Sequence, residues 1–146
     1  MKKLFKKQEV NLTQLEKLSK EFAKKIKISE IVLFKGDLGS GKTTFIRSII
    51  NNIYLLNKKK PPTTIPSPSF PILQIYSLNK FSIYHYDFFR VKKVNEINEI
   101  GFEENIIGNI TFIEWPELVI SKIYDYKYYE VDISIIGEKN RKISIY

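Results

Sequence analysis

The sequence has 146 residues, with 24 Lys and Arg against 16 Asp and Glu, and a net charge of +8. This length is typical of one domain, and a hydrophobic content of 43% supports an ordinary core, which excludes wholesale disorder. Cysteine is absent, which excludes a disulfide partner and cysteine-held metals, and no apolar run approaches the roughly 18 residues of a membrane span. The basic start lacks the apolar segment of a secretory signal, so we expect a cytoplasmic protein with a single domain over residues 1–146.

The positive charge is unevenly distributed and is carried by lysine. Residues 1–60 contain 15 basic and 5 acidic residues, whereas residues 61–146 contain 9 and 11. The chain has 21 Lys but only 3 Arg, alongside 24 Ile, which is the composition expected of an AT-rich genome. Arginine rather than lysine is the residue of forked phosphate and base recognition. The charge therefore favours a solvated lysine face, with nucleic-acid binding kept open.

The first third of the chain predicts a helix, a buried strand and a second helix. Residues 13–16, Thr-Gln-Leu-Glu, have the pattern of a capping box, and the apolar spacing that follows predicts a helix over 13–27. Residues 31–34 are all apolar, which is typical of a central parallel strand buried on both faces. A glycine-rich loop follows, and apolar residues at helical spacing then predict a helix over 44–56.

The rest of the chain predicts strands separated by one loop and one helix. Five of the six prolines lie between residues 61 and 71, which predicts a loop. The elements after it are strands over 70–76 and 81–86, a helix over 94–107, a buried strand over 110–113, and a terminal hairpin over 128–136 and 141–146. This order predicts an α/β fold of three layers, with a mixed, mostly parallel sheet between helices and a C-terminal β-hairpin.

One motif carries specific chemistry. Residues 36–43, Gly-Asp-Leu-Gly-Ser-Gly-Lys-Thr, fit G-x-x-x-x-G-K-[ST], between the predicted buried strand and the second helix. Glycines let the backbone amides converge on phosphate oxygens, and the helix adds its positive N-terminal end. Lys42 would reach the β- and γ-phosphates, and the Thr43 hydroxyl would bind Mg²⁺. The fold class predicted is therefore P-loop NTPase-like; the alternative is a glycine turn with an incidental lysine.

A phosphate loop needs a carboxylate for its metal ion, usually at the end of a buried strand. Glu114 follows the strand at 110–113, and Asp87 follows the strand at 81–86, so both are candidates. His85 alternates with Asp87 along its strand, which predicts one shared face, but one histidine cannot build a metal site. We expect His85 to be packed or hydrogen-bonded.

The proline-rich loop contains hydroxyl side chains where P-loop proteins have γ-phosphate-sensing switch segments. These are Thr63, Thr64, Ser67 and Ser69. A plain connector is the alternative interpretation. An Asn-Lys-x-Asp motif is absent, so the sequence does not indicate GTP specificity.

Four motifs in order resemble the bacterial TsaE (YjeE) family of small P-loop ATPases. They are the loop and helix start at 36–47, Ser-Pro-Ser-Phe at 67–70, His-Tyr-Asp-Phe-Phe-Arg at 85–90, and Glu-Trp-Pro-Glu at 114–117. The resemblance covers nearly the whole chain. Ser69 stands where the family usually has Thr, and Phe89 where Tyr is common; neither change removes a charge or a metal ligand.

The resemblance implies a role in threonylcarbamoyladenosine modification of tRNA. Members of the family bind the TsaB–TsaD heterodimer, which transfers the group to tRNA, and their ATP hydrolysis resets that complex. The implied cofactors are ATP and Mg²⁺, with tRNA contacted only through the complex. Because no arginine is clearly placed as a finger, we expect hydrolysis to be slow without partners.

The resemblance also assigns roles to residues. Lys42 would hold phosphate as part of the catalytic machinery, Thr43 and Glu114 would hold Mg²⁺, and Asp87 would orient or activate the attacking water. Trp115 would lie beside the site, with Ser67 and Ser69 in a switch-like loop. The nucleotide-binding residues expected are Asp37, Leu38, Gly39, Ser40, Gly41, Lys42, Thr43 and Thr44, with Thr13 and Arg141 near the nucleotide.

Two functions from other classes compete with this hypothesis. A small-molecule P-loop kinase commonly has an arginine-bearing lid and an acceptor pocket, and three arginines leave little for a lid. An ATP-independent tRNA-binding module would use the lysine-rich first half and would bind with strong salt dependence.

Overall fold

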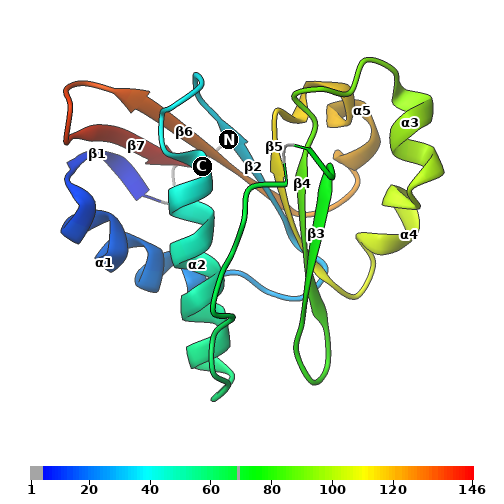
Figure 1. The fold of residues 1–146 in the computed structure, drawn as a ribbon, viewed down its shortest axis with the longest axis horizontal. Helices are drawn as coiled ribbons and strands as arrows, with labels where there is room; N and C mark the ends of the chain where they lie inside the picture. Colours follow the sequence, from blue (N-terminus) through cyan, green and yellow to red (C-terminus); the bar gives the residue numbers. More distant parts are fainter. Residues whose placement is uncertain (1–4, 69) are drawn as a thin grey trace.

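The fold of the computed structural model, which describes residues 5–68 and 70–146, is built on one sheet of seven strands. The strands lie in the order β1-β7-β6-β2-β5-β4-β3 (Figure 1). Their bounds are Phe5–Val10 (β1), Ile31–Lys35 (β2), Leu73–Ser77 (β3), Ser82–Asp87 (β4), Ile110–Glu114 (β5), Tyr128–Ile135 (β6) and Arg141–Ile145 (β7). Residues 1–4 of the basic start, and Ser69 of the predicted switch-like loop, lie outside the described residues.

Helices cover both faces of this sheet, which confirms the predicted three layers. The helices are α1 (Leu12–Ala23), α2 (Lys42–Leu56), α3 (Val94–Glu99), α4 (Phe102–Asn105) and α5 (Ile120–Ile123), with a short 3₁₀ helix, η1 (Pro116–Leu118). One apolar core lies under α1 and α2, and a second lies under α3, α4 and α5 (Figure 1). No helix within the described ranges is long and apolar enough to cross a membrane.

The centre of the sheet is parallel, and this places the site. Strands β6, β2, β5 and β4 run in the same direction, whereas β3, β7 and β1 pair antiparallel with their neighbours. In this register Phe34 of β2 lies opposite Glu114 of β5, and Asp87 of β4 lies opposite the same Glu114. The carboxyl ends of three strands therefore meet at one edge of the sheet, which is where open α/β sheets bind ligands.

The predicted buried strand is confirmed as β2, the middle strand of the sheet. Val32 and Phe34 face the core beneath α1 and α2, while Ile31 and Leu33 face the second core. The Phe34 ring packs edge-on against Phe112 of β5, with ring centroids 5.8 Å apart. Apolar side chains on both faces thus hold β2 in register beside β5.

The terminal hairpin is also confirmed, with β6 and β7 antiparallel. Strand β6 runs parallel to β2, so the hairpin continues the main sheet and brings its tip near the phosphate loop. Strand β1, which the sequence did not predict, adds to the outer edge of β7. Its basic sequence lacks the apolar alternation that indicates a strand.

Two predicted helices needed correction. Helix α1 begins at Leu12 and ends at Ala23, so the predicted span of 13–27 and its Thr13 capping box are wrong. The cap is Asn11, whose Oδ1 accepts a hydrogen bond from Gln14 N at 2.9 Å while Gln14 Oε1 accepts one from Asn11 N at 2.9 Å. Asparagine is among the strongest N-cap residues, and Asn-x-x-Gln is itself a capping box.

The single helix predicted over 94–107 is in fact two short helices, α3 and α4. Gly101 separates them with a left-handed backbone, φ 74° and ψ 30°, which interrupts the helical hydrogen-bond ladder. The predicted strands at 70–76 and 81–86 are confirmed as β3 and β4, with bounds shifted by one to three residues.

Candidate functional site

The phosphate loop over residues 36–43 joins the carboxyl end of β2 to the start of α2. Gly36 has a φ of +156°, and a Cβ there would lie 2.6 Å from the Ile133 carbonyl oxygen and 2.7 Å from Ser40 Oγ. Only glycine allows this close passage beside β6. The 15-residue helix α2 begins at Lys42, with Gly41 as its N-cap. It has no acidic residue in its first turn and, within the described chain, no side-chain cap on its amides. Its N-terminal amides are therefore available to an anion.

The ammonium group of Lys42 lies inside this loop. Its Nζ donates hydrogen bonds to the carbonyl oxygens of Gly36 at 2.5 Å and Asp37 at 3.1 Å. It also lies 4.3 Å from the centre of the Trp115 ring, a cation–π distance. Burial lowers the pKa of Lys42, and the nearby charges of Glu114 and other carboxylates act against that shift. The direct hydrogen-bond partners of the cation are thus neutral carbonyl oxygens, which a phosphate group could replace.

Thr43, in the first turn of α2, contacts Glu114, the last residue of β5. The Thr43 hydroxyl donates to the Glu114 carboxylate, with Oγ1 3.0 Å from Oε1 and 3.2 Å from Oε2. Glu114 is 2% exposed, and its Oε2 also lies 2.8 Å from His85 Nε2. A hydroxyl and a carboxylate are hard oxygen donors, which is the donor set that suits Mg²⁺. The residues present therefore fit this ion.

These two oxygen donors do not form a complete protein cage. Within residues 5–68 and 70–146, no group of three or more His, Asp or Glu side chains is arranged to hold a metal ion. Mg²⁺ in phosphate-transferring proteins is bound by one or two protein ligands together with the substrate phosphates.

Asp87 is the second carboxylate at this edge. It lies opposite Glu114 in the β4–β5 register, and its Oδ1 accepts a hydrogen bond from Phe89 N at 2.9 Å. Burial raises the pKa of Asp87, and the negative charge of Glu114 raises it further. The Phe89 amide, His85 and Lys42 oppose this shift without cancelling it. Asp87 is thus fixed in direction and a better proton acceptor than an exposed aspartate.

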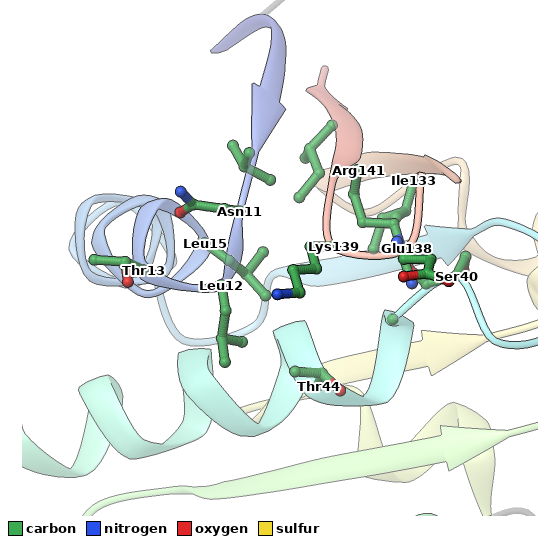
Figure 2. A pocket seen from close by; sticks show the side chains of 13 residues that line it. Asn11, Leu12, Thr13, Leu15, Ser40, Thr44, Ile133, Glu138, Lys139 and Arg141 are labelled. Carbon is green, nitrogen blue, oxygen red and sulfur yellow. The ribbon is translucent and has the colours of Figure 1, made fainter. Parts of the chain in front are cut away.

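A cavity of about 600 Å³ opens beside the phosphate loop, between the start of α1 and the tip of the terminal hairpin (Figure 2). It is lined by Val10, Asn11, Leu12, Thr13, Leu15, Ser40, Gly41, Thr44, Ile133, Glu138, Lys139, Arg141 and Ile143. Figure 2 shows the α1 residues on one side, Glu138, Lys139 and Arg141 on the other, and Thr44 at the start of α2. Apolar walls and a few polar groups suit a nucleotide base and sugar.

Arg141 connects the hairpin to the phosphate loop. Its Nε donates to the Ser40 carbonyl oxygen at 2.8 Å, and one of its terminal nitrogens donates to the Gly39 carbonyl oxygen at 3.5 Å. The other terminal nitrogen donates to the carbonyl oxygens of Gly137 and Asn140, both at 2.9 Å. The Arg141 side chain therefore holds the phosphate loop through its carbonyl oxygens and also lines the cavity.

The proline-rich loop is held against α2 by Arg47, whose Nε donates to the Ile65 carbonyl oxygen. Ser67 is half-buried in this loop, and Ser69 is outside the described residues. The guanidinium of Arg90 lies 5.7 Å from the centre of the exposed Phe70 ring. The role of Ser67 and Ser69 as a switch-like loop stays a prediction.

The structure gathers the predicted site residues into two adjoining groups. One group joins Lys42 and Thr43 of the phosphate loop with Asp87, Glu114 and Trp115 at the adjoining strand ends. The cavity beside it is lined by Thr13 and Arg141, which were predicted near the nucleotide, and by three of the predicted nucleotide-binding loop residues, Ser40, Gly41 and Thr44. Asp37, Leu38 and Gly39 form the turn of the loop, and Leu38 is exposed.

Sequence reasoning missed two features of this site. One is the apolar wall of the cavity from Leu12 and Leu15, which could be placed only once the α1 cap was known. The other is the contact of His85 with Glu114, for which the alternation of His85 with Asp87 was a partial signal.

Comparison with known proteins gives consistent matches. A family model described as "Threonylcarbamoyl adenosine biosynthesis protein TsaE" matches residues 10–143. The tRNA threonylcarbamoyladenosine biosynthesis protein TsaE of Rickettsia prowazekii is 42% identical over 133 residues, covering 91% of this chain and 88% of the relative. A relative of the same name from Aquifex aeolicus is 32% identical over 130 residues, covering 89% and 86%. The crystal structure of Bacillus subtilis YdiB shares the fold, with a TM-score of 0.71 and 22% identity over 99% of this chain and 84% of that one.

The raised pKa of Asp87 gives a test of the site's electrostatics. The folded protein keeps a proton on Asp87 at pH values where the unfolded chain has lost it, so this contribution to stability is lost as pH rises through the folded-state pKa. Asn keeps an oxygen for the Phe89 amide without a charge. We expect Asp87→Asn to have a higher free energy of unfolding than wild type at about pH 8, and the difference to vanish toward about pH 4. Urea unfolding of the two proteins measures this difference.

Asp125→Asn is the matched control: because Asp125 is exposed, the stability of this variant should follow that of wild type at every pH in the same range. A lower stability of Asp87→Asn than of wild type at about pH 8 would contradict a net cost of burying this charge.

Proposed function

This chain belongs to the TsaE family, as its ordered motifs predicted, and on that premise we propose that it binds ATP and hydrolyses it slowly in tRNA threonylcarbamoyladenosine modification. One observation carries the proposal. The Thr43 hydroxyl lies 3.0 and 3.2 Å from the two Glu114 carboxylate oxygens, directly beside a phosphate loop. This pairing of a P-loop hydroxyl with a strand-end carboxylate is what a nucleotide-bound Mg²⁺ requires.

The triphosphate would bind along residues 37–44. Backbone amides of the loop and the start of α2 supply donors, and Lys42 exchanges its contacts with Gly36 and Asp37 for phosphate oxygens. The base and sugar would occupy the adjoining cavity, where Thr13 and Arg141 line opposite sides. Supporting this orientation, the cavity adjoins Ser40 and Gly41, so base and phosphates are within one ligand's length.

Thr43 and Glu114 would hold Mg²⁺. When bound, this ion supplies positive charge that neutralises the phosphate oxygens as they become more negative during transfer. Glu114 suits the role because it is buried and its carboxylate is already directed at Thr43 Oγ1.

Asp87 would orient the attacking water and accept its proton. The water oxygen bonds to the γ-phosphorus, the bond from that phosphorus to the β,γ-bridging oxygen breaks, and ADP leaves with that oxygen. Burial supports this role, because a raised pKa makes Asp87 a stronger base at neutral pH. The Phe89 amide holds its Oδ1, which fixes the direction of the carboxylate.

Hydrolysis by the protein alone would be slow because its arginines have other partners. The sequence has three arginines. Arg47 donates to the proline-rich loop, Arg141 donates to loop carbonyls, and Arg90 lies over Phe70. An arginine acting on the transferred phosphate is worth roughly 10³–10⁵ in rate. A partner that supplied or released such a cation would accelerate the reaction.

We propose that this partner is the TsaB–TsaD heterodimer and that the chain contacts tRNA only through it. We place this reaction in the cytoplasm. The family relationship supports the pathway, since the relatives are named for tRNA threonylcarbamoyladenosine biosynthesis. The predominance of lysine over arginine supports indirect rather than direct contact with tRNA.

Two alanine variants should separate the metal ligand from the water-orienting residue. We expect Glu114→Ala to weaken ATP binding in Mg²⁺ while leaving binding in EDTA unchanged, because only the metal ligand is lost. Asp87→Ala should spare ATP binding and lower the hydrolysis rate by about 10²–10⁴-fold. Calorimetry with and without Mg²⁺, and phosphate release, measure the two effects.

Lys42→Ala serves as the reference without nucleotide binding, and Lys80→Ala, at an exposed turn, serves as the unaffected control. Parallel losses in Glu114→Ala and Asp87→Ala would contradict their separate roles. Wild-type ATP affinity in Lys42→Ala would contradict the nucleotide site itself.

The partner assignment predicts nucleotide-dependent association. The wild-type chain should co-purify with the TsaB–TsaD pair of the same organism when ATP is present, and Lys42→Ala should not. Size-exclusion chromatography of the purified proteins measures this directly. Absence of association with and without ATP would overturn the partner while leaving the ATPase proposal standing.

A further inference from the structure

The one histidine of the chain lies fully buried behind the proposed metal site. His85 is in β4, two residues before Asp87, and is 0% exposed. Because side chains alternate along a strand, His85 and Asp87 share the sheet face beneath α2. His85 lies opposite Phe112 in the β4–β5 register, one residue pair short of Asp87 and Glu114. Its ring therefore reaches Glu114 from the interior of the sheet.

The contact joins two specific atoms. His85 Nε2 lies 2.8 Å from Glu114 Oε2, and its other ring nitrogen, Nδ1, is buried without a hydrogen-bond partner among the described residues. A proton on Nδ1 alone would leave a buried N–H unpaired and would set an Nε2 lone pair against a carboxylate lone pair. The proton therefore belongs on Nε2, which donates to Glu114.

The Glu114 carboxylate is thus held from two sides that are not equivalent. Thr43 contacts both of its oxygens from the side of the phosphate loop, and His85 contacts Oε2 from the core. Thr43 and Glu114 are the two proposed ligands, so the bond between them cannot also fix the carboxylate once an ion lies between them. Among the described residues, His85 is the side chain that still holds it.

We propose that His85 is a positioning residue, which orients the Glu114 carboxylate toward Mg²⁺ without touching the ion. The proposal rests on the proposed function, because it takes Glu114 as a metal ligand. Outer partners of metal ligands of this kind typically change metal affinity by 10–100-fold when removed. If the role of His85 were only structural, its replacement would alter stability without altering the response to Mg²⁺.

Two conservative variants separate these roles. The amide nitrogen of His85→Gln can stand near the position of Nε2 and still donate to Glu114, whereas that of His85→Asn ends near Nδ1 and cannot reach it. The measurement is ATP affinity during a Mg²⁺ titration, followed by the fluorescence of Trp115, the one tryptophan in the chain. The same titration in EDTA reports binding that does not depend on the metal.

We expect His85→Asn to need about 10–100-fold more Mg²⁺ for half of the full gain in ATP affinity, with His85→Gln close to wild type. All three proteins should bind ATP equally in EDTA. Thr111→Val is the matched control, because Thr111 is likewise buried in the neighbouring strand without a partner for its hydroxyl among the described residues, and it faces away from the site. Its Mg²⁺ response should equal that of wild type.

An equal Mg²⁺ response in His85→Asn and wild type would overturn the role of His85 alone. A wild-type protein whose ATP affinity ignores Mg²⁺ would instead overturn the proposed metal site. Nitrogen-15 spectra of the single imidazole test the contact without any variant, even if the variants fail to fold. A proton on Nε2 is expected, and a bare Nε2 would overturn the proposal.

Discussion

The parallel pairing of β4, β5 and β2 is the constraint on which the rest of the site depends. Its register sets Asp87 opposite Glu114 and sets Glu114 opposite Phe34, two residues before the phosphate loop begins. A slip of one residue in β5 would turn Glu114 to the other face of the sheet, because strand side chains alternate. The apolar packing of Phe112 on Phe34 therefore stabilises the register that places the Glu114 carboxylate on the face of the phosphate loop.

The same burial makes the free site electrostatically unfavourable. Lys42 and Asp87 are each 5% exposed, and burial shifts the pKa of both toward the neutral form. Their partners in the protein are chiefly backbone groups, namely loop carbonyls for Lys42 and the Phe89 amide for Asp87. In the proposed complex, the phosphates would bring negative charge to Lys42 and the metal ion would bring positive charge near Asp87, so this arrangement would favour binding over stability. Buried charge held for a ligand is characteristic of functional sites.

Much of this fold could be predicted from the sequence, because short local patterns identify its central strand, loop and helix. Residues 31–34 are apolar throughout, and residues 36–43 fit one motif, so strand, loop and helix followed directly. Features that depend on distant residues could not be predicted. The edge strand β1 is defined by its pairing with β7, which is distant in sequence. The contact of His85 with Glu114 likewise joins two strands, β4 and β5. Gly101 was a local signal for a helix break that the acidic helical pattern masked.

The proposed function depends on Thr43 and Glu114 together holding the metal ion of a nucleotide in the phosphate loop. A crystal structure of the wild-type protein with Mn²⁺ and a non-hydrolysable ATP analogue tests it most directly. We expect one anomalous peak for Mn²⁺, coordinated by Thr43 Oγ1, the Glu114 carboxylate and phosphate oxygens. A peak coordinated by Asp87 without Glu114, or an analogue bound away from the loop, would contradict it.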